Sequence, residues 1–378
     1  MPVKIIWTEI PEEFSENENP QKNFLPQTFE NLLIKSDNFP VLREFVQKGM
    51  LIDFIYIDPP YNTGKDFAYK DKFSEDFWLS FMNKRLRLAQ KLLTQSGVIF
   101  IAIDQSELYH LKLLCDEIFG TENFVNDFMW LHGKGKKDKW SRTLQQHTLC
   151  YAKNKKKLLP FCETEISCWA TTNQDNDVRG NWFSGSISFS EKRSNKNHAN
   201  YYSITSPGGK IWTRQWQLSK EDMQKLIDEN KIFWGKPPKY DCVPRKKIFN
   251  NTETKVIPKN IISDVQSTRA AQKYLNSLLK SDSVGKEDFC DTFENPKPVD
   301  LILHFLNIVQ IPKNAIILDF FAGSGTTFEA VCKLNQTQNS HRKCILIQKD
   351  ENNIAEICKK RCQKTAMLYN QNIEFVNF

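Results

Sequence analysis

The chain has 378 residues, of which 40% are hydrophobic and 26% are charged, a balance typical of a protein with a packed core. Its 52 basic and 45 acidic side chains give a formal net charge of +7, which by itself is a weak indication of a polyanionic partner. The longest apolar runs, such as residues 97–103, are far shorter than the ~20 residues of a membrane span, and the first residues lack the pattern of a secretory signal. We therefore expect a cytoplasmic protein that does not enter a membrane.

The cysteines indicate a reduced protein without a metal centre. Ten cysteines are scattered along the chain. The closest pair, Cys358 and Cys362, has helical i,i+4 spacing, with no histidine or second cysteine pair at the spacing of zinc ligands. We therefore expect free, mostly buried thiols and no metal site.

Helix and strand signals alternate in the first third of the chain, after an irregular lead-in over residues 1–30. In chain order, the hydrophobic periodicity predicts a helix over 37–50, a buried strand over 51–57, a helix over 73–97, a buried strand over 98–104 and a helix over 105–120. We expect Ser74 to cap the second helix and Gly97 to end it, because these residue types favour those positions. Asp104 and Glu107 have the spacing of a capping box for the third helix.

The pattern changes between residues 133 and 290, where the chain becomes polar, basic and rich in tryptophan. Short strand signals and turns that contain glycine or proline replace the long helices there. The alternation of helix and strand resumes over residues 291–378. We therefore expect an α/β fold with one doubly wound, mostly parallel sheet from residues 31–132 and 291–378, interrupted by a smaller inserted region over 133–290.

Two turns at the ends of buried strands contain the residues best suited to chemistry. The first is the tetrapeptide Asp58–Tyr61, whose two prolines end the strand abruptly because they lack an N–H and have a fixed φ. The second is the turn Gly323–Gly325 between an apolar strand and a helix, where glycine lets the backbone approach a ligand closely. Open parallel sheets bind ligands beyond the carboxyl ends of their strands, so we expect both turns to border one cavity.

Three motifs resemble the DNA amino-methyltransferases that use S-adenosylmethionine. DPPY at Asp58–Tyr61 resembles their catalytic tetrapeptide, FAGSG at Phe321–Gly325 resembles their cofactor loop, and NPKP at Asn295–Pro298 resembles the motif before the cofactor strand. The order of the motifs is similar to that of the permuted β group. The longer runs around them resemble the modification subunits of type III restriction systems and their shorter type II relatives, and the chain length favours a type II or solitary enzyme.

The resemblance implies both a fold and an activity. The fold would be the seven-stranded, Rossmann-like sheet of these methyltransferases, with residues 133–290 as a target-recognition region. The activity would be site-specific transfer of a methyl group to the N6 amine of adenine in double-stranded DNA, within a bacterial restriction-modification system. The partners would be double-stranded DNA and S-adenosylmethionine, and the resemblance leaves open a homodimer and a separate restriction endonuclease.

The catalytic tetrapeptide suits an exocyclic amine because such an amine is a poor nucleophile until its lone pair is released from the ring. The Asp58 carboxylate and the carbonyl of Pro59 or Pro60 could each accept one N–H, which draws the nitrogen towards tetrahedral geometry. Tyr61 offers a flat face on which a base flipped out of the duplex can stack. We therefore expect Asp58, Pro59, Pro60 and Tyr61 to be the catalytic residues.

For the cofactor, the resemblance implies contacts from all three motifs and from the end of the second strand. The expected residues are Asp58, Asn295, Lys297, Pro298, Asp319, Phe320, Phe321, Ala322, Gly323, Ser324, Gly325, Thr326 and Gln348. Within this set, Asp319 would accept from the methionine ammonium, Phe321 would pack on the adenine ring and Lys297 would meet the methionine carboxylate. Gln348 stands where many relatives have a glutamate for the ribose hydroxyls, and Asp350 follows closely.

A basic run in the inserted region is expected to bind phosphates of the DNA backbone. Its members are Lys134, Lys136, Lys137, Lys139 and Arg142. Two alternatives to an adenine methyltransferase remain open from the sequence. The same two-acceptor geometry serves cytosine N4, and a non-catalytic DNA-specificity subunit could retain the fold.

Overall fold

The computed structural model describes residues 8, 28–64, 71–133, 139–166, 169–236, 238–280, 293 and 295–377. They belong to two compact units. The main unit comprises Met1–Cys162 and Ile257–Phe378, and the inserted unit comprises Glu163–Val256. The expected inserted region over 133–290 encloses the inserted unit, and the segments that flank this unit within those limits belong to the main unit.

The main unit is built on a sheet that contains nine strands among the described residues. From edge to edge these are β13 (Ile261–Ile262), β4 (Phe124–Leu131), β5 (Gln145–Ala152), β3 (Leu93–Ile103), β2 (Ile52–Ile57), β14 (Ile316–Asp319), β15 (Lys343–Gln348), β1 (Leu32–Lys35) and β16 (Glu374–Asn377). Only β5 runs antiparallel to its neighbours in this sheet. The expected mostly parallel sheet is thus confirmed, and the short edge strands β13 and β16 extend the expected seven strands.

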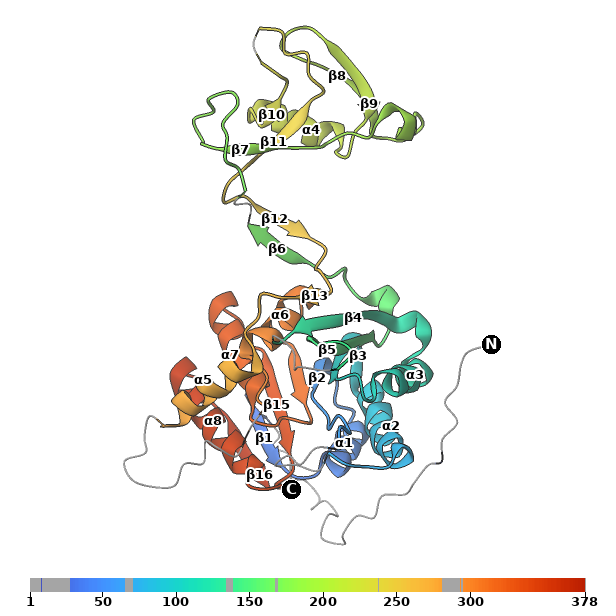
Figure 1. Cartoon of the computed structure of the whole chain (residues 1–378), viewed down its shortest axis with the longest axis vertical. Helices are drawn as coiled ribbons and strands as arrows, with labels where there is room; N and C mark the ends of the chain where they lie inside the picture. The colour runs from blue at the N-terminus through green and yellow to red at the C-terminus, as the bar shows by residue number, and fades with distance from the viewer. Residues whose placement is uncertain are drawn as a thin grey trace. The chain divides into compact units, whose positions relative to one another are not determined.

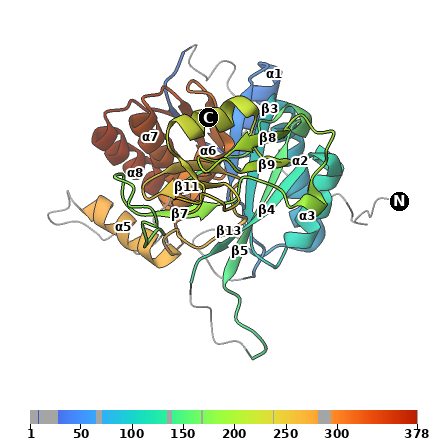
Figure 2. The same ribbon diagram turned by 90° about the horizontal axis from the view of Figure 1, so that it is seen from above.

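Helices cover both faces of this sheet (Figures 1 and 2). One layer contains α1 (Asn38–Gln47), α2 (Glu75–Leu92) and α3 (Leu108–Phe119), and the other contains α6 (Val299–Val309), α7 (Thr326–Gln338) and α8 (Ile354–Tyr369), with α5 (Thr268–Lys280) against α8. Alternate side chains of β2 pack against the two helix layers, because successive residues of a strand point to opposite faces of the sheet. Phe54 and Tyr56 pack in the α6–α7 layer, whereas Ile55 and Ile57 pack in the α1–α2–α3 layer.

The strand β2 and the strand β14 are neighbours at the point where the order of the sheet reverses. From β2 the chain passes through α2 to β3 on one side, and from β14 it passes through α7 to β15 on the other side. In doubly wound sheets, the crevice at such a switch point is the place where ligands bind. The parallel pairing of Ile317 with Phe54 therefore brings the two chemically distinctive turns together.

Two local expectations for the first helices were wrong. Ser74 does cap α2, since its Oγ accepts a hydrogen bond from the N–H of Phe77, but the helix ends at Leu92, before Gly97. Gly97 lies in β3, where an added Cβ would come within 3.0 Å of the Ile52 carbonyl oxygen. No capping box opens α3, because the Glu107 carboxylate accepts from the Asn62 amide and pairs with the His110 ring of α3 instead of a backbone N–H.

In its described residues, the inserted unit combines short antiparallel sheets with one α-helix. Its elements are β6 (Glu163–Ile166), β7 (Trp182–Gly185), β8 (Tyr201–Thr205), β9 (Ile211–Gln215), α4 (Lys220–Asp228), β10 (Ile232–Phe233), β11 (Arg245–Phe249) and β12 (Glu253–Val256). The strands form a β10-β11-β7 sheet, a β12-β6 pair and a β8-β9 hairpin. Trp216, Trp234 and Met223 are buried in its small core, so part of the tryptophan enrichment serves packing.

The eight cysteines in the described ranges are free thiols, and most of them are buried. These ranges contain no group of three His, Cys, Asp or Glu side chains arranged to hold a metal ion. Of the helices described, none is both long and apolar enough to cross a bilayer.

Candidate active site

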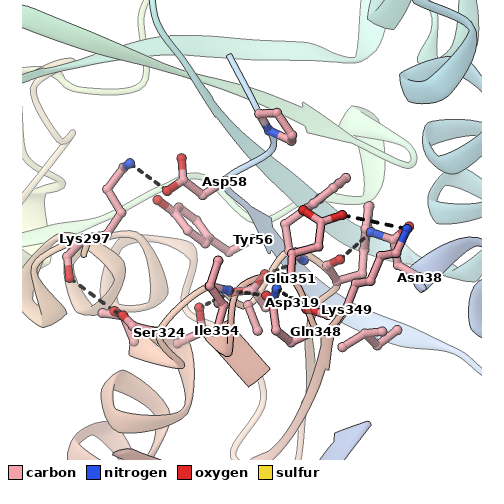
Figure 3. A pocket seen from close by; sticks show the side chains of 18 of the residues that line it. Asn38, Tyr56, Asp58, Lys297, Asp319, Ser324, Gln348, Lys349, Glu351 and Ile354 are labelled. Atoms are coloured by element: carbon pink, nitrogen blue, oxygen red, sulfur yellow. Dashed lines mark hydrogen bonds and ion pairs between the residues drawn. The ribbon is translucent and has the colours of Figure 1, made fainter. Parts of the chain in front are cut away.

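A cavity of about 550 Å³ lies beyond the carboxyl ends of β2 and β14 (Figure 3). Its volume is in the range of small-molecule sites. The first turn contributes Asp58 and Pro60 to its lining, and the second contributes the run from Asp319 to Ser324. The prediction that both turns border one cavity is confirmed.

The Asp58 carboxylate is held from two sides. The hydroxyl of Tyr61 donates to its Oδ1 at 2.5 Å, and the Lys297 ammonium lies 2.6 Å from its Oδ2. The same ammonium lies 5.2 Å from the centroid of the Tyr61 ring. Lys297, which was expected to meet a cofactor carboxylate, lines the cavity and pairs with the aspartate of the tetrapeptide.

The tetrapeptide Asp58–Tyr61 and the residue after it are held in place by hydrogen bonds from their surroundings. The indole N–H of Trp78 in α2 donates to the carbonyl of Pro60 at 2.8 Å. Asn62 has a left-handed φ of 57°, and its backbone N–H donates to the buried Asp71 carboxylate at 2.9 Å. The Asn62 amide also donates to Glu107 at 2.7 Å, which explains why Glu107 is unavailable as a helix cap.

The glycine turn needs its glycines for two separate reasons. Gly323 and Gly325 have φ values of 53° and 82°, in the left-handed region that favours glycine. A Cβ on Gly325 would also meet the sulfur atoms of Cys358 and Cys362 at 3.1 Å, so the helix α8 packs directly against the turn. Close packing is therefore as strong a constraint here as conformation.

Asp319 ends β14 as a buried carboxylate in a polar setting. Its Oδ2 accepts from the Thr327 hydroxyl at 2.5 Å, and its Oδ1 accepts from the Phe321 N–H at 3.0 Å. Burial, reinforced by the nearby Asp58 charge, raises the pKa of Asp319 to about 7, and the two hydrogen bonds oppose this rise. Asp319 is therefore close to half-protonated at neutral pH, and a cation bound beside it would favour the ionised form.

A buried arginine ties α8 to the glycine turn. Arg361 pairs with Glu329 of α7 at 2.9 Å and donates to the hydroxyls of Ser324 and Thr326 at 3.0 and 2.7 Å. Thr326 in turn donates to the Lys297 carbonyl at 3.2 Å. The turn, the NPKP segment and two helices thus form one connected polar network.

Gln348 is placed at the cavity, but its amide is already engaged. Its Oε1 accepts from the Gly323 N–H at 2.7 Å, and its Nε2 donates to the Lys349 carbonyl at 2.9 Å. Asp350 is absent from the cavity wall and pairs with Lys35 at 2.6 Å. Glu351 does line the cavity, where its carboxylate lies 3.7 Å from the half-exposed Lys349 ammonium.

The comparisons with known proteins agree with this geometry. Residues 52–360 match the family described as DNA methylase. The chain belongs to the DNA methylase family. Its match to the type II methyltransferase M.KpnI of Klebsiella pneumoniae is 30% identical and covers 79% of this chain and 75% of that protein.

Relatives of a second kind in this family are type III modification subunits. The StyLTI Mod subunit of Salmonella typhimurium is 31% identical over 89% of this chain and 57% of its own length. The EcoPI Mod subunit of Escherichia phage P1 is 32% identical over 89% of this chain and 62% of its own length. The chain therefore spans about three fifths of the length of these two relatives.

Most of the expected methylase residues reach the cavity. The expected residues in its wall are Asp58, Pro60, Asn295, Lys297, Asp319, Phe320, Phe321, Ala322, Gly323, Ser324, Thr326 and Gln348. Tyr61 contacts Asp58 instead of forming the wall, and Gly325 packs against α8. Pro298 precedes α6 and borders a separate cavity of about 260 Å³. Pro59 lies between Asp58 and Pro60 in the tetrapeptide, outside the residues that form the wall.

Sequence reasoning missed an aromatic wall of this cavity. Phe73, Phe77 and Phe81 line it from α2 and the turn before it, and the Phe81 ring lies 5.8 Å from that of Phe321. Their i,i+4 spacing was visible, but a stripe of aromatics on a helix more often belongs to a core. Arg85 continues the stripe, with its guanidinium 3.6 Å from the Phe81 ring centroid.

Another missed residue is Tyr56, in the strand that leads to the tetrapeptide. Its side chain is 1% exposed and lines the cavity, and its hydroxyl has no hydrogen-bond partner within the described ranges. Burial and the charges of Asp58 and Asp319 raise the pKa of this phenol well above its usual value. Tyr56 is therefore a donor that lacks an acceptor, which a ligand could supply.

Two of the expected phosphate contacts are described, and both are exposed. The Lys139 ammonium lies 4.9 Å from the ring centroid of the exposed Trp140. Arg142 is the second residue after Trp140. The remaining expected residues Lys134, Lys136 and Lys137 lie outside the described ranges. In the inserted unit, Lys210 and Arg214 flank the ring of Trp212 at 4.2 and 5.6 Å.

Proposed function

We propose that this protein is a site-specific DNA methyltransferase that transfers a methyl group from S-adenosylmethionine to the N6 amine of a flipped adenine. The observation that carries the proposal is the meeting of Asp58 and the glycine turn around one cavity. Membership of the DNA methylase family and similarity to proteins named as type II methyltransferases and Mod subunits support it. A role in a restriction-modification system is part of the proposal.

The lining of the cavity fits the chemical groups of S-adenosylmethionine. Asp319 suits the methionine ammonium, and the Tyr56 hydroxyl with the Lys297 ammonium suits the carboxylate. Phe321 and Phe81 form an apolar, aromatic wall for the adenine ring. When bound, S-adenosylmethionine supplies a methyl group on a positively charged sulfur, which is a strong electrophile.

We assign the ribose contact to Glu351 in place of Gln348. A ribose offers two hydroxyl donors, and a carboxylate with free lone pairs is the better acceptor for them. The Gln348 side chain uses its oxygen and its nitrogen on the Gly323 N–H and the Lys349 carbonyl, which fixes the glycine turn. Gln348 therefore acts on the cofactor loop, and Glu351 is the accessible acid.

Asp58 and the Pro59 carbonyl are the proposed acceptors for the two amine protons. The sequence did not decide whether the carbonyl of Pro59 or that of Pro60 accepts the second amine proton. The Pro60 carbonyl already accepts from the Trp78 indole, which favours the Pro59 carbonyl. With both protons held, the nitrogen lone pair is freed to point along the path of transfer. The Tyr61 hydroxyl orients the carboxylate through Oδ1, and its ring offers a stacking face for the base.

The amine of adenine is paired inside the duplex, so this reaction needs a base flipped out of the stack. The exposed Lys139 and Arg142 are the described residues that we assign to DNA phosphates. We assign target recognition to the inserted unit, whose Lys210, Trp212 and Arg214 combine positive charge with an aromatic ring. This function is compatible with a homodimer and with a separate restriction endonuclease as a partner.

Expression in a host that lacks DNA methylation, followed by sequencing that detects modified bases, tests the proposal directly. We expect N6-methyladenine at one recurrent sequence. Asp58→Ala should abolish the modification without weakening the affinity for S-adenosylhomocysteine, because Asp319 and Glu351 remain. The matched control is Asp104→Ala at the end of the neighbouring strand β3, outside the cavity wall, which should retain full modification.

The other outcomes discriminate between functions. Modification at cytosine N4 would reject the adenine assignment and keep methyl transfer. Cofactor and DNA binding without any modified base would indicate a non-catalytic specificity subunit. Turnover by Asp58→Ala would reject the role of the tetrapeptide.

A further inference from the structure

Both oxygens of the Asp58 carboxylate are engaged in the structure. Tyr61 donates to Oδ1 at 2.5 Å. Lys297 lies 2.6 Å from Oδ2 (Figure 3). An oxygen paired this closely with an ammonium has much of its charge neutralised, so it is a weaker acceptor for another N–H. A target amine would therefore compete with Tyr61 and Lys297 for the Asp58 carboxylate, and Asp58 would accept it more strongly if one of them withdrew.

Lys297 is the partner that can withdraw, on one condition. Its side chain is flexible, whereas the Tyr61 ring is packed against both hydrophobic layers of the main unit. The Lys297 side chain is only 9% exposed, and a buried ammonium without a counter-charge is strongly disfavoured. The lysine can leave Asp58 only if another anion replaces it.

The buried phenol of Tyr56 indicates where that anion can bind. Its hydroxyl lacks a partner within the described part of the chain, and it shares the cavity wall with Lys297 and Asp58. Since burial keeps this phenol protonated, it can only gain from an incoming acceptor. A carboxylate is an acceptor that suits a phenol and an ammonium together.

The other cations of the cavity wall already have partners. Arg85 donates to Asp37 at 3.1 Å and to Asn38 at 2.5 Å. Lys349 is half-exposed and lies 3.7 Å from Glu351. Lys297 is therefore the cation of the cavity wall that pairs with Asp58 of the tetrapeptide. The Thr326 hydroxyl donates to the Lys297 carbonyl and so links this lysine to the glycine turn.

We infer that Lys297 exchanges Asp58 for the carboxylate of the cofactor's methionine group, with the Tyr56 hydroxyl as second donor, and so frees Asp58 to accept the target amine. This inference rests on the proposed function. It makes Lys297 a positioning residue that couples the two ligands. Recognition of the amine should then depend on a cofactor that has a carboxylate.

The coupling can be measured by binding, without turnover. Once the target sequence is known, two duplexes are compared, one with adenine at the target position and one with purine, which lacks the amine. Their dissociation constants are measured without cofactor, with S-adenosylhomocysteine, and with its decarboxylated analogue. The ratio of the two constants is compared between these arms, so the different cost of flipping the two bases cancels.

For the wild type, we expect a preference for adenine that is about tenfold larger with S-adenosylhomocysteine than in the other two arms, as one charge-assisted hydrogen bond would give. Lys297→Met should show the adenine preference without any cofactor, because Asp58 is already free. Tyr56→Phe should weaken binding of S-adenosylhomocysteine but not of the decarboxylated analogue. Lys333→Met, which removes another lysine that pairs with an aspartate, is the matched control and should behave as wild type.

An adenine preference that is equal in all three wild-type arms would overturn the inference, as would a Lys297→Met variant that still needs the carboxylate. If Lys297→Met does not fold, the three wild-type arms decide alone. A protein that binds no cofactor and methylates no DNA would instead reject the proposed function. The two failures are therefore distinguishable.

Discussion

Cofactor affinity should depend on pH through Asp319, because the cavity needs this carboxylate in its ionised form to hold an ammonium. Burial raises the pKa of Asp319 to about 7 in the ligand-free protein. A bound cation lowers that pKa, so binding below about pH 7 releases a proton and becomes weaker as the pH falls. The ionised fraction rises from about one tenth at about pH 6 to about nine tenths at about pH 8, which predicts about tenfold tighter binding.

Isothermal titration of S-adenosylhomocysteine over this range measures the effect. Buffers of different ionisation enthalpy should reveal proton release in the acidic half of the range only. Asp319→Asn should bind weakly with little dependence on pH, and 5′-methylthioadenosine, which lacks the amino-acid part, should show a flat profile with the wild type. A flat profile for S-adenosylhomocysteine, or an unchanged slope in Asp319→Asn, would refute the reasoning.

Three further predictions follow from described contacts. Glu351→Gln should weaken S-adenosylhomocysteine binding about tenfold in the same titration, whereas Asp350→Asn, whose carboxylate pairs with Lys35 away from the cavity, should leave it nearly unchanged. Arg361→Met leaves Glu329 buried without its cation and should lower the free energy of unfolding by about 3–5 kcal/mol in urea denaturation; a loss below about 1 kcal/mol would contradict a structural role for the pair. DNA affinity should fall linearly with salt on logarithmic axes, and Lys139→Ala should reduce that slope by about one if this lysine neutralises a phosphate.

The sequence was sufficient to predict the central sheet and the meeting of its two turns. Continuous apolar runs before Asp58 and before the glycine turn marked strands buried on both faces. The proline pair and the glycines then marked where each strand stops. Because the carboxyl ends of parallel strands share one edge, placing both turns at a common cavity needed no knowledge of side-chain contacts.

Contacts between distant residues could not be predicted in this way. Lys297 and Asp58 are 239 positions apart, and nothing local in either segment shows that they pair. Glu107 had the local spacing of a helix cap, but the distant Asn62 amide competes for its carboxylate. Similarly, the bond from Gly323 to Gln348 depends on the pairing of β14 with β15, which changes the role expected of that amide.

The paired strands β6 and β12 have a consequence for how specificity can change. The chain enters the inserted unit at Glu163 and leaves it at Val256, and these two residues are partners in one antiparallel register. The first and last residues of the inserted unit are therefore adjacent. The whole unit between them could be replaced by another folded segment without cutting a strand of the central sheet. Under the proposed role of the inserted unit in target recognition, such a replacement would give the same reaction centre a new target sequence, in evolution or in the laboratory.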